Sequence, residues 1–282
     1  MTMKKYAVIT MDVEDWYHTY FPRDDVEKSV TLLDGLDVAL NIMDRKNIKG
    51  SFFVVGEIAG KLSDKLKVMD LNGHDIAFHN WQHIRPVDIS TRDYKEQLQH
   101  GRQILESILG HAVSGYRAPS FGIDDERFAA VKELFQYDSS MIKPQRSAKY
   151  GQVHLKGFTE VFPTIYKDNG FTEFEVSTQS IAGLNLLLGG GYIRMLPWMF
   201  MKWMTKKYLE TGKPYVMYIH PIDLSAKPIP RVKGIGFGRY LRTHIGRKTM
   251  ARKFMKVIRM LEDEGYEFVT FEQLRKMDLS NG

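Results

Sequence analysis

Short hydrophobic runs alternate with amphipathic stretches through the first half of the chain. The apolar runs, rich in β-branched and aromatic residues, are YAVITMD, GSFFVVG, HDIAFH and SGYRAP, beginning at Tyr6, Gly50, His74 and Ser114. The stretches TLLDGLDVALNIMDRKN, DYKEQLQHGRQILESIL and DDERFAAVKELF, which separate them, place apolar residues at helical spacing. This alternation predicts parallel strands joined by right-handed helical crossovers.

Three polar residues stand at the carboxyl ends of these runs. Asp12 ends the first run, His79 the third, and Arg117 lies near the end of the fourth. Barrels and open parallel sheets build their sites at this end of the strands. We therefore expect these side chains to meet at one site.

The alternation is interrupted between about residues 145 and 195, where the runs VFPTIY and FTEFEVS and a glycine triplet occur. It resumes at Tyr215 with YVMYIH, a basic helical stretch and a last strand, YEFVTF. We expect one catalytic domain over residues 1–282, with an insertion of about 145–195 over the barrel mouth.

Composition narrows the chemistry. The 282 residues contain no cysteine, which excludes disulfides, thiolate zinc sites and cysteine nucleophiles, so a metal has to bind His, Asp or Glu. The net charge of +6 suits an anionic partner, but it does not choose among nucleic acid, phospholipid and a phosphorylated substrate.

The sequence also suggests a location. The apolar run near the N-terminus is too short for a signal-peptide core, and no apolar stretch approaches the length of a membrane span. We expect a cytoplasmic protein, soluble or attached peripherally at the inner membrane face.

Two histidines and three acidic residues form a candidate metal site. His79 and His83 are four residues apart, which on a helical turn would place both imidazoles on one face. Asp12, Glu14 and Asp15 crowd the end of the first strand, where a cation would relieve their repulsion. Two histidines and one carboxylate would hold zinc or a related ion with a fourth position open. The alternative is that the acids cap the following turn.

Three further residues are candidates for catalysis. His220 ends the run YVMYIH, where an imidazole of near-neutral pKa could protonate a leaving amine. Arg117 is followed by Ala118 and Pro119, and Asp138 follows the short run FQY. Taken singly, a histidine at a strand end is more often structural, and Arg117 and Asp138 are most simply surface ion-pair residues.

Ordered motifs over nearly the whole chain resemble the polysaccharide deacetylases of the NodB-homology group, also called carbohydrate esterase family 4. TMDVEDW is similar to a variant first motif of the branch that serves surface-polysaccharide pathways. The other matching segments are SFFVVG, GHDIAFHNWQH, YRAPSFG, YDSS, GGGYIRMLP and YIHP. The resemblance implies a distorted (β/α) barrel of about seven parallel strands.

The resemblance also implies a metal site. Asp15, His79 and His83 would hold a divalent ion that polarises an acetyl carbonyl, and the ion expected is Zn²⁺. The residue inserted between Asp12 and the later acids leaves Glu14 as the alternative carboxylate, since strand alternation places it on the same side as Asp12.

Roles for the remaining residues follow from the same resemblance. Asp12 would be the catalytic base, oriented by Arg117. His220 would be the acid that protonates the departing amine, oriented by Asp138.

The function implied is a metal-dependent hydrolase that removes N-acetyl groups from a sugar in a glycan, glycolipid precursor or polysaccharide. One alternative is another amide hydrolase on the same barrel, of the cyclic-ureide type. A second is a non-catalytic barrel that binds glycan or nucleic acid through residues 227–259, which contain no acidic residue. Aromatic residues are sparse in that stretch, so nucleic acid is not expected. The sequence does not identify the sugar, its linkage or its carrier.

A last segment suggests contact with an anionic membrane. Residues 195–204 (MLPWMFMKWM), followed by Lys206 and Lys207, combine aromatic and methionine bulk with positive charge. We expect this segment to face a bilayer that carries a lipid-linked sugar substrate. The alternative is an ordinary core helix.

Overall fold

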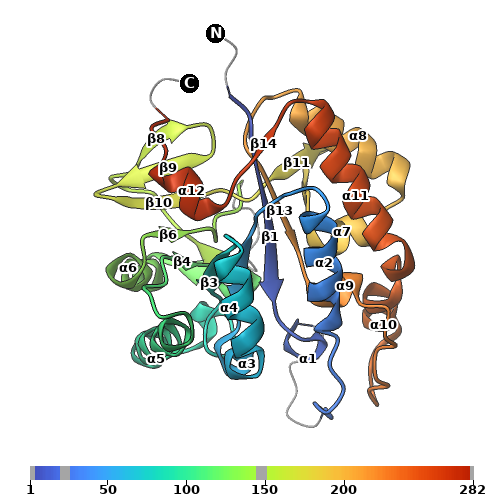
Figure 1. The fold of residues 1–282 in the computed structure, drawn as a ribbon, viewed down its shortest axis with the longest axis horizontal. Coiled ribbons are helices and arrows are strands. Elements are labelled where there is room, and N and C mark those ends of the chain that lie inside the picture. The colour runs from blue at the N-terminus through green and yellow to red at the C-terminus, as the bar shows by residue number, and fades with distance from the viewer. Residues whose placement is uncertain (1–3, 20–25, 144–150, 280–282) are drawn as a thin grey trace.

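A curled and mostly parallel sheet forms the centre of the computed structural model, which describes residues 4–19, 26–143 and 151–279 (Figure 1). The strand order is β13-β1-β2-β3-β4-β6-β10-β9-β8, and β14 also pairs with β1. The pairs from β13 to β10 are parallel, whereas β9 and β8 continue the sheet in antiparallel register. The sheet curls into a half-barrel, which confirms the predicted distorted α/β barrel.

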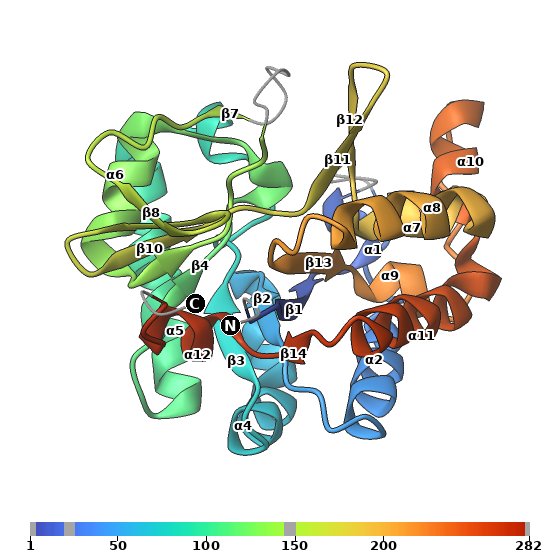
Figure 2. The ribbon, with the colours of Figure 1, turned by 90° about the horizontal axis from the view of Figure 1, so that it is seen from above.

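The strands of this sheet are β1 (Tyr6–Val13), β2 (Ser51–Val54), β3 (Asp75–Phe78), β4 (Gly115–Tyr116), β6 (Tyr137–Asp138), β8 (Thr159–Phe162), β9 (Ile165–Asp168), β10 (Phe171–Phe174), β13 (Tyr215–Ile219) and β14 (Glu267–Phe268). Outside it lie the hairpin of β11 (Thr178–Ile181) and β12 (Leu184–Leu187) and the short pair of β5 (Ile123–Asp124) and β7 (Gly151–Gln152). The hairpin projects away from the half-barrel (Figure 2).

The helices are α1 (Trp16–Thr19), α2 (Asp34–Asp44), α3 (Gly56–Ala59), α4 (Ser63–Leu71), α5 (Thr91–Leu109), α6 (Asp125–Leu134), α7 (Gly190–Met195), α8 (Trp198–Leu209), α9 (Pro221–Leu224), α10 (Phe237–His244), α11 (Arg247–Asp263) and α12 (Phe271–Lys276). Short 3₁₀ turns occur at Gly60–Leu62, Pro86–Asp88 and Pro119–Phe121. Helices α2, α4, α5, α6 and α11 lie outside the curled sheet (Figures 1 and 2). Within the described ranges, no helix has the length and apolar character that a membrane crossing requires.

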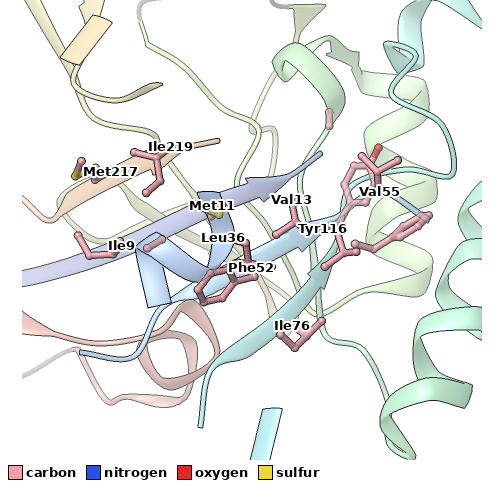
Figure 3. Close-up of a cluster of buried hydrophobic side chains, with 14 of the residues drawn as sticks. Ile9, Met11, Val13, Leu36, Phe52, Val55, Ile76, Tyr116, Met217 and Ile219 are labelled. Atoms are coloured by element: carbon pink, nitrogen blue, oxygen red, sulfur yellow. The ribbon is translucent and has the colours of Figure 1, made fainter. Parts of the chain in front are cut away.

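Strand β1 is buried on both faces, and its side chains alternate between two cores. Ile9, Met11 and Val13 pack in the larger core between the sheet and the outer helices, together with Phe52 (Figure 3). Val8 belongs to the second core, on the opposite face of the strand. The even-numbered positions therefore face the interior of the half-barrel, and Asp12 continues that row toward the carboxyl end.

The interior of the half-barrel is apolar at one end and polar at the other. Phe271 and Leu274 of α12 belong to the interior core, and α12 lies at the opposite end of the sheet from the arrowhead of β1 (Figure 1). The interior is thus filled with apolar side chains at the amino ends of the strands. At their carboxyl ends it is lined by the polar residues described next.

Candidate functional site

The site residues follow neighbouring strands of the sheet. Asp12 lies in β1 and Glu14 follows it, His79 follows β3, and His220 follows β13. Because β13, β1, β2 and β3 are adjacent and parallel, their carboxyl ends meet at one edge. The structure therefore brings the carboxyl ends of these strands together, as the sequence analysis expected.

Glu14, His79 and His83 form a compact cluster of potential metal ligands. Their ligand atoms all lie within 4.8 Å of one another. His83 Nε2 is 2.7 Å and His79 Nε2 is 3.9 Å from Glu14 Oε2. The side chains are almost completely buried, so solvent does little to screen the charge on the carboxylate.

The two histidines do not share a helical face, contrary to the expectation from their spacing. Residues 79–83 form a bend after β3, in which Asn80 has a positive φ of 64°. Asparagine tolerates this conformation better than most side chains. The bend brings the His79 and His83 rings to a centroid distance of 5.2 Å.

His79 presents a nitrogen suited to a cation. Its Nδ1 lies 2.8 Å from the carbonyl oxygen of Arg117, which can only accept a hydrogen bond, so Nδ1 carries the proton. Its buried Nε2 has no hydrogen-bond partner in the described part of the chain. Burial lowers the pKa of His79 from 6.5 to about 4, although the charge of Asp12 acts in the opposite direction. The ring is therefore neutral at neutral pH. A neutral imidazole whose Nδ1–H bonds a carbonyl is the usual second-shell arrangement of a metal ligand.

Glu14 supplies the negative charge of the cluster. Burial alone would raise its pKa, but His83, His220 and His79 outweigh that effect and lower the pKa to about 2. The N–H of Glu14 donates to the carbonyl of Asp12 over 3.0 Å, in a tight turn at the end of β1. The carboxylate is therefore ionised and held in the site.

Asp15 has a different environment. Its Oδ1 accepts hydrogen bonds from the N–H groups of Trp16 at 2.8 Å and Leu32 at 2.9 Å. It thus caps the start of α1 and ties down the segment that leads to α2. The structure brings Glu14, and not Asp15, together with the two histidines.

Asp12 forms an ion pair with a buried arginine. Arg117 Nη1 donates to Asp12 Oδ1 and to Thr10 Oγ1, each over 2.8 Å. The Cζ atom of the guanidinium lies 4.1 Å from the centroid of the Phe53 ring, within range of a cation–π interaction. The other oxygen of Asp12, Oδ2, is 3.9 Å from both His79 Nε2 and His220 Nε2, so it faces the centre of the site.

His220 is oriented by a carboxylate that the sequence analysis did not single out. Its Nδ1 lies 3.0 Å from Asp223 Oδ2, and Arg194 Nε donates to Asp223 Oδ1 over 2.7 Å. Burial opposes protonation of His220, but Asp223, Glu14 and Asp12 together raise its pKa to about 9. The signal was present in the sequence, because Asp223 follows His220 by three residues in the segment HPID.

Asp138 is linked through Ser140 to the loop that follows Arg117. Its two carboxylate oxygens accept from the N–H and hydroxyl of Ser140, whose hydroxyl also accepts from the N–H of Ala118. The pairing of Asp138 with His220 expected from the sequence is not found in the ranges that the structure describes. Asp138 instead braces the loop that carries Arg117, and burial raises its pKa to about 6.

Two family models match the chain. Residues 18–137 match the model described as "Polysaccharide deacetylase", and residues 139–276 match a domain of unknown function, DUF3473. The two matched ranges begin after β1, so Asp12, Glu14 and Asp15 lie outside both of them.

Curated relatives are similar over part of the chain. A peptidoglycan-N-acetylglucosamine deacetylase of Bacillus cereus is 28% identical over 103 residues, which are 35% of this chain and 38% of that protein. Chitin deacetylase 1 of Cryptococcus neoformans is 28% identical over 95 residues, 34% of this chain and 20% of that protein. The chain thus matches well under half the length of these relatives.

Solved structures share the fold across both chains. A Mycobacterium smegmatis protein described as a polysaccharide deacetylase superimposes with a TM-score of 0.65 at 18% identity, covering 98% of this chain and 91% of that one. A family 4 acetyl xylan esterase of Clostridium thermocellum, solved with a cobalt ion, gives 0.53 at 14% identity, covering 96% and 90%. A family 4 pseudoenzyme of Bacillus anthracis gives 0.54 at 13% identity, covering 97% and 66%.

Proposed function

Because the chain belongs to the polysaccharide deacetylase family, we propose that it is a metal-dependent hydrolase that removes N-acetyl groups from an N-acetylated sugar. The observation that carries the proposal is the buried cluster of Glu14, His79 and His83. Within it, His79 Nε2 is buried and lacks a hydrogen-bond partner among the described residues. A divalent cation would satisfy that nitrogen.

We propose Glu14 in place of Asp15 as the metal carboxylate, with His79 and His83 as the other ligands. One carboxylate and two imidazoles form a donor set that suits Zn²⁺. When bound there, a divalent ion supplies Lewis acidity that polarises the acetyl carbonyl. Asp15 keeps a structural role, since its carboxylate is occupied by two backbone N–H groups.

Asp12 is the proposed base. Arg117 holds Asp12 Oδ1, so Asp12 Oδ2 remains directed toward the cluster and can accept a proton from the attacking water. Asp138 and Ser140 act one step further out, by fixing the loop in which Arg117 lies.

His220 is the proposed acid. Burial opposes protonation, but the hydrogen bond to Asp223 raises the pKa of His220 and favours the protonated ring, whose Nδ1–H donates to Asp223. The Nε2–H then faces Asp12 and Glu14, where a departing amine would collect its proton. Arg194 fixes Asp223, and therefore the orientation of the ring.

The substrate class is proposed from the relatives. The curated relatives are described as chitin and peptidoglycan deacetylases, both of which are named for N-acetylated glycans. For this chain we propose an N-acetylhexosamine within a glycan or on a lipid carrier. A pseudoenzyme on the same fold is the alternative, and the retained ligand cluster, base and acid favour catalysis.

The test is acetate release from a panel of nucleotide-, lipid- and polymer-linked N-acetylhexosamines. We expect release by the zinc-loaded protein, loss after chelation and recovery when zinc is restored. Asp12→Asn is the matched control, which keeps the metal and loses turnover. No acetate release from any member of the panel by protein with a full equivalent of zinc would overturn the hydrolase assignment.

A further inference from the structure

Helix α10 exposes large apolar side chains. Of its eight residues only Thr243 is buried. Phe237 is 77% exposed, Tyr240 48%, Leu241 41%, and Ile245, just after the helix, 38%. We call these four residues the α10 surface. Figure 2 shows α10 projecting from the molecule on the same side as the β11–β12 hairpin. An apolar patch that the chain does not cover indicates an interaction site.

The helix is anchored at its carboxyl end by polar contacts. The buried guanidinium of Arg194 donates to the carbonyls of Arg242 at 2.7 Å and Thr243 at 3.3 Å, and also to that of Ile245. Gly246 has a φ of +79°, and a Cβ there would lie 1.9 Å from the carbonyl oxygen of Arg194. The chain therefore turns closely over Arg194. These contacts fix the position of α10, while its apolar residues remain exposed on the surface.

The segment of chain that carries the α10 surface is basic. Residues 227–259 contain no aspartate or glutamate. The exposed cations of this stretch include Arg231, Lys233, Arg239, Arg242, Lys248 and Arg252. Exposed apolar side chains within a basic segment complement a partner that combines negative charge with an apolar interior.

We propose that the α10 surface docks on an anionic lipid bilayer. Aliphatic side chains such as Leu241 and Ile245 suit the boundary between headgroups and acyl chains, whereas single-stranded nucleic acid requires open aromatic platforms. Of the two aromatic residues, Tyr240 already stacks on His244, with ring centroids 4.0 Å apart and an interplanar angle of 25°. The exposed arginines and lysines of the same segment would then attract the anionic headgroups.

The proposed contact through α10 differs from the membrane contact expected from the sequence, which was residues 195–204, in and just before α8. Helix α8 buries Met201 and Met204, and Trp198 packs against the core with Lys256 4.9 Å from its ring centroid. Helix α8 therefore packs one face in the core, as the alternative interpretation predicted, and leaves its other face exposed. Met199 and Trp203 remain exposed, at 76% and 44%.

The position of α10 fits a substrate held at the membrane. Arg194 contacts both the last carbonyls of α10 and Asp223, the residue that orients His220. Figure 1 shows α9 and α10 toward the same end of the molecule as the arrowhead of β1, where the site lies. Docking through α10 would therefore hold the site close to the headgroups. The docking itself does not depend on the hydrolase assignment.

The experiment is sedimentation of the whole protein with vesicles of phosphatidylcholine alone or mixed with phosphatidylglycerol. We expect binding to the mixed vesicles at low salt and loss of binding at high salt. Equal binding to both vesicle types, or binding to neither, would overturn the proposal. Binding to a single-stranded oligonucleotide with none to vesicles would overturn it in favour of nucleic acid.

Two pairs of variants locate the contact. Arg239→Gln with Arg242→Gln should weaken partitioning about thirtyfold, whereas the control Arg92→Gln with Lys95→Gln, on the exposed face of α5, removes the same charge and should change it little. Phe237→Ser with Leu241→Ser should weaken it about tenfold or more. The apolar control is Val68→Ser with Leu71→Ser, whose native residues are 57% and 84% exposed on α4.

Circular dichroism and thermal melting establish that each variant is folded. If the α10 variants bind vesicles as well as their controls do, the α10 surface is not the docking site. Acetate release from a soluble substrate is measured in parallel. Loss of vesicle binding with retained release would support docking and leave the hydrolase proposal standing.

Discussion

The carboxylate that holds the metal can be identified by comparing Glu14→Gln with Asp15→Asn. Both substitutions remove one negative charge and keep the shape of the side chain, so a general electrostatic effect would be the same in both. The structure predicts different outcomes, because Glu14 lies against His83 and His79 whereas Asp15 accepts two backbone hydrogen bonds.

The sizes of the two effects follow from these contacts. Loss of a second-shell partner typically weakens metal binding 10- to 100-fold, so Glu14→Gln should weaken zinc binding by more than about 100-fold. Asp15→Asn keeps an acceptor for Trp16 and Leu32, but two charge-assisted hydrogen bonds become neutral ones, at a cost of about 1 to 2 kcal/mol. That cost corresponds to a fall of about 4 °C in Tm.

Zinc affinity is measured by competition with a chromophoric chelator, and zinc content by elemental analysis after dialysis. Thermal melts of the chelator-treated proteins give the stability of the fold without the metal. We expect zinc loss in Glu14→Gln alone and the lower Tm in Asp15→Asn. Zinc retained by Glu14→Gln and lost by Asp15→Asn would refute the assignment and return the ligand to Asp15.

Three further substitutions test the surroundings of the site. Asp223→Asn should lower kcat about 100-fold with zinc content and KM unchanged, because His220 loses its orienting carboxylate; an unchanged kcat in steady-state assays would contradict this role. Gly35→Ala should destabilise the fold by about 2 kcal/mol, since the added Cβ would lie 1.8 Å from a carbonyl oxygen of α9. At the control position, Gly60→Ala, the added Cβ meets nothing within 4 Å, so the free energy of unfolding measured in urea should change little. Burial lowers the pKa of His74 from 6.5 to about 4, so the unfolded chain binds the proton first and stability is lost as pH falls through that window. His74→Asn should flatten this loss by up to about 3 kcal/mol in chelator-treated protein, and an unchanged pH profile of unfolding would count against it.

The sequence alone determined that the first half alternates strands with helices, and at which end of the strands the site lies. Strand alternation places Val8 and Asp12 on one face of β1 and Met11 on the other, and the structure shows that the face of Val8 and Asp12 is the inner one. Parallel strands joined by helical crossovers bring their carboxyl ends to one edge, so Asp12 and His79 were expected at the same end of the sheet. These are consequences of local periodicity, which a sequence carries directly. The pairing of β13 with β1, which adds His220, was decided by the tertiary structure.

The tertiary structure alone decided which atoms meet within the site. Spacing suggested a helical turn for His79 and His83, but a bend at Asn80, with its positive φ, joins them. The choice between Glu14 and Asp15 depended on where the chain turns after β1 and on which N–H groups arrive from distant segments. Hydrogen-bond partners of this kind are set by distances of a few ångströms between remote parts of the chain. Hydrophobic periodicity fixes the face on which a residue lies, but it does not fix which remote group that residue contacts.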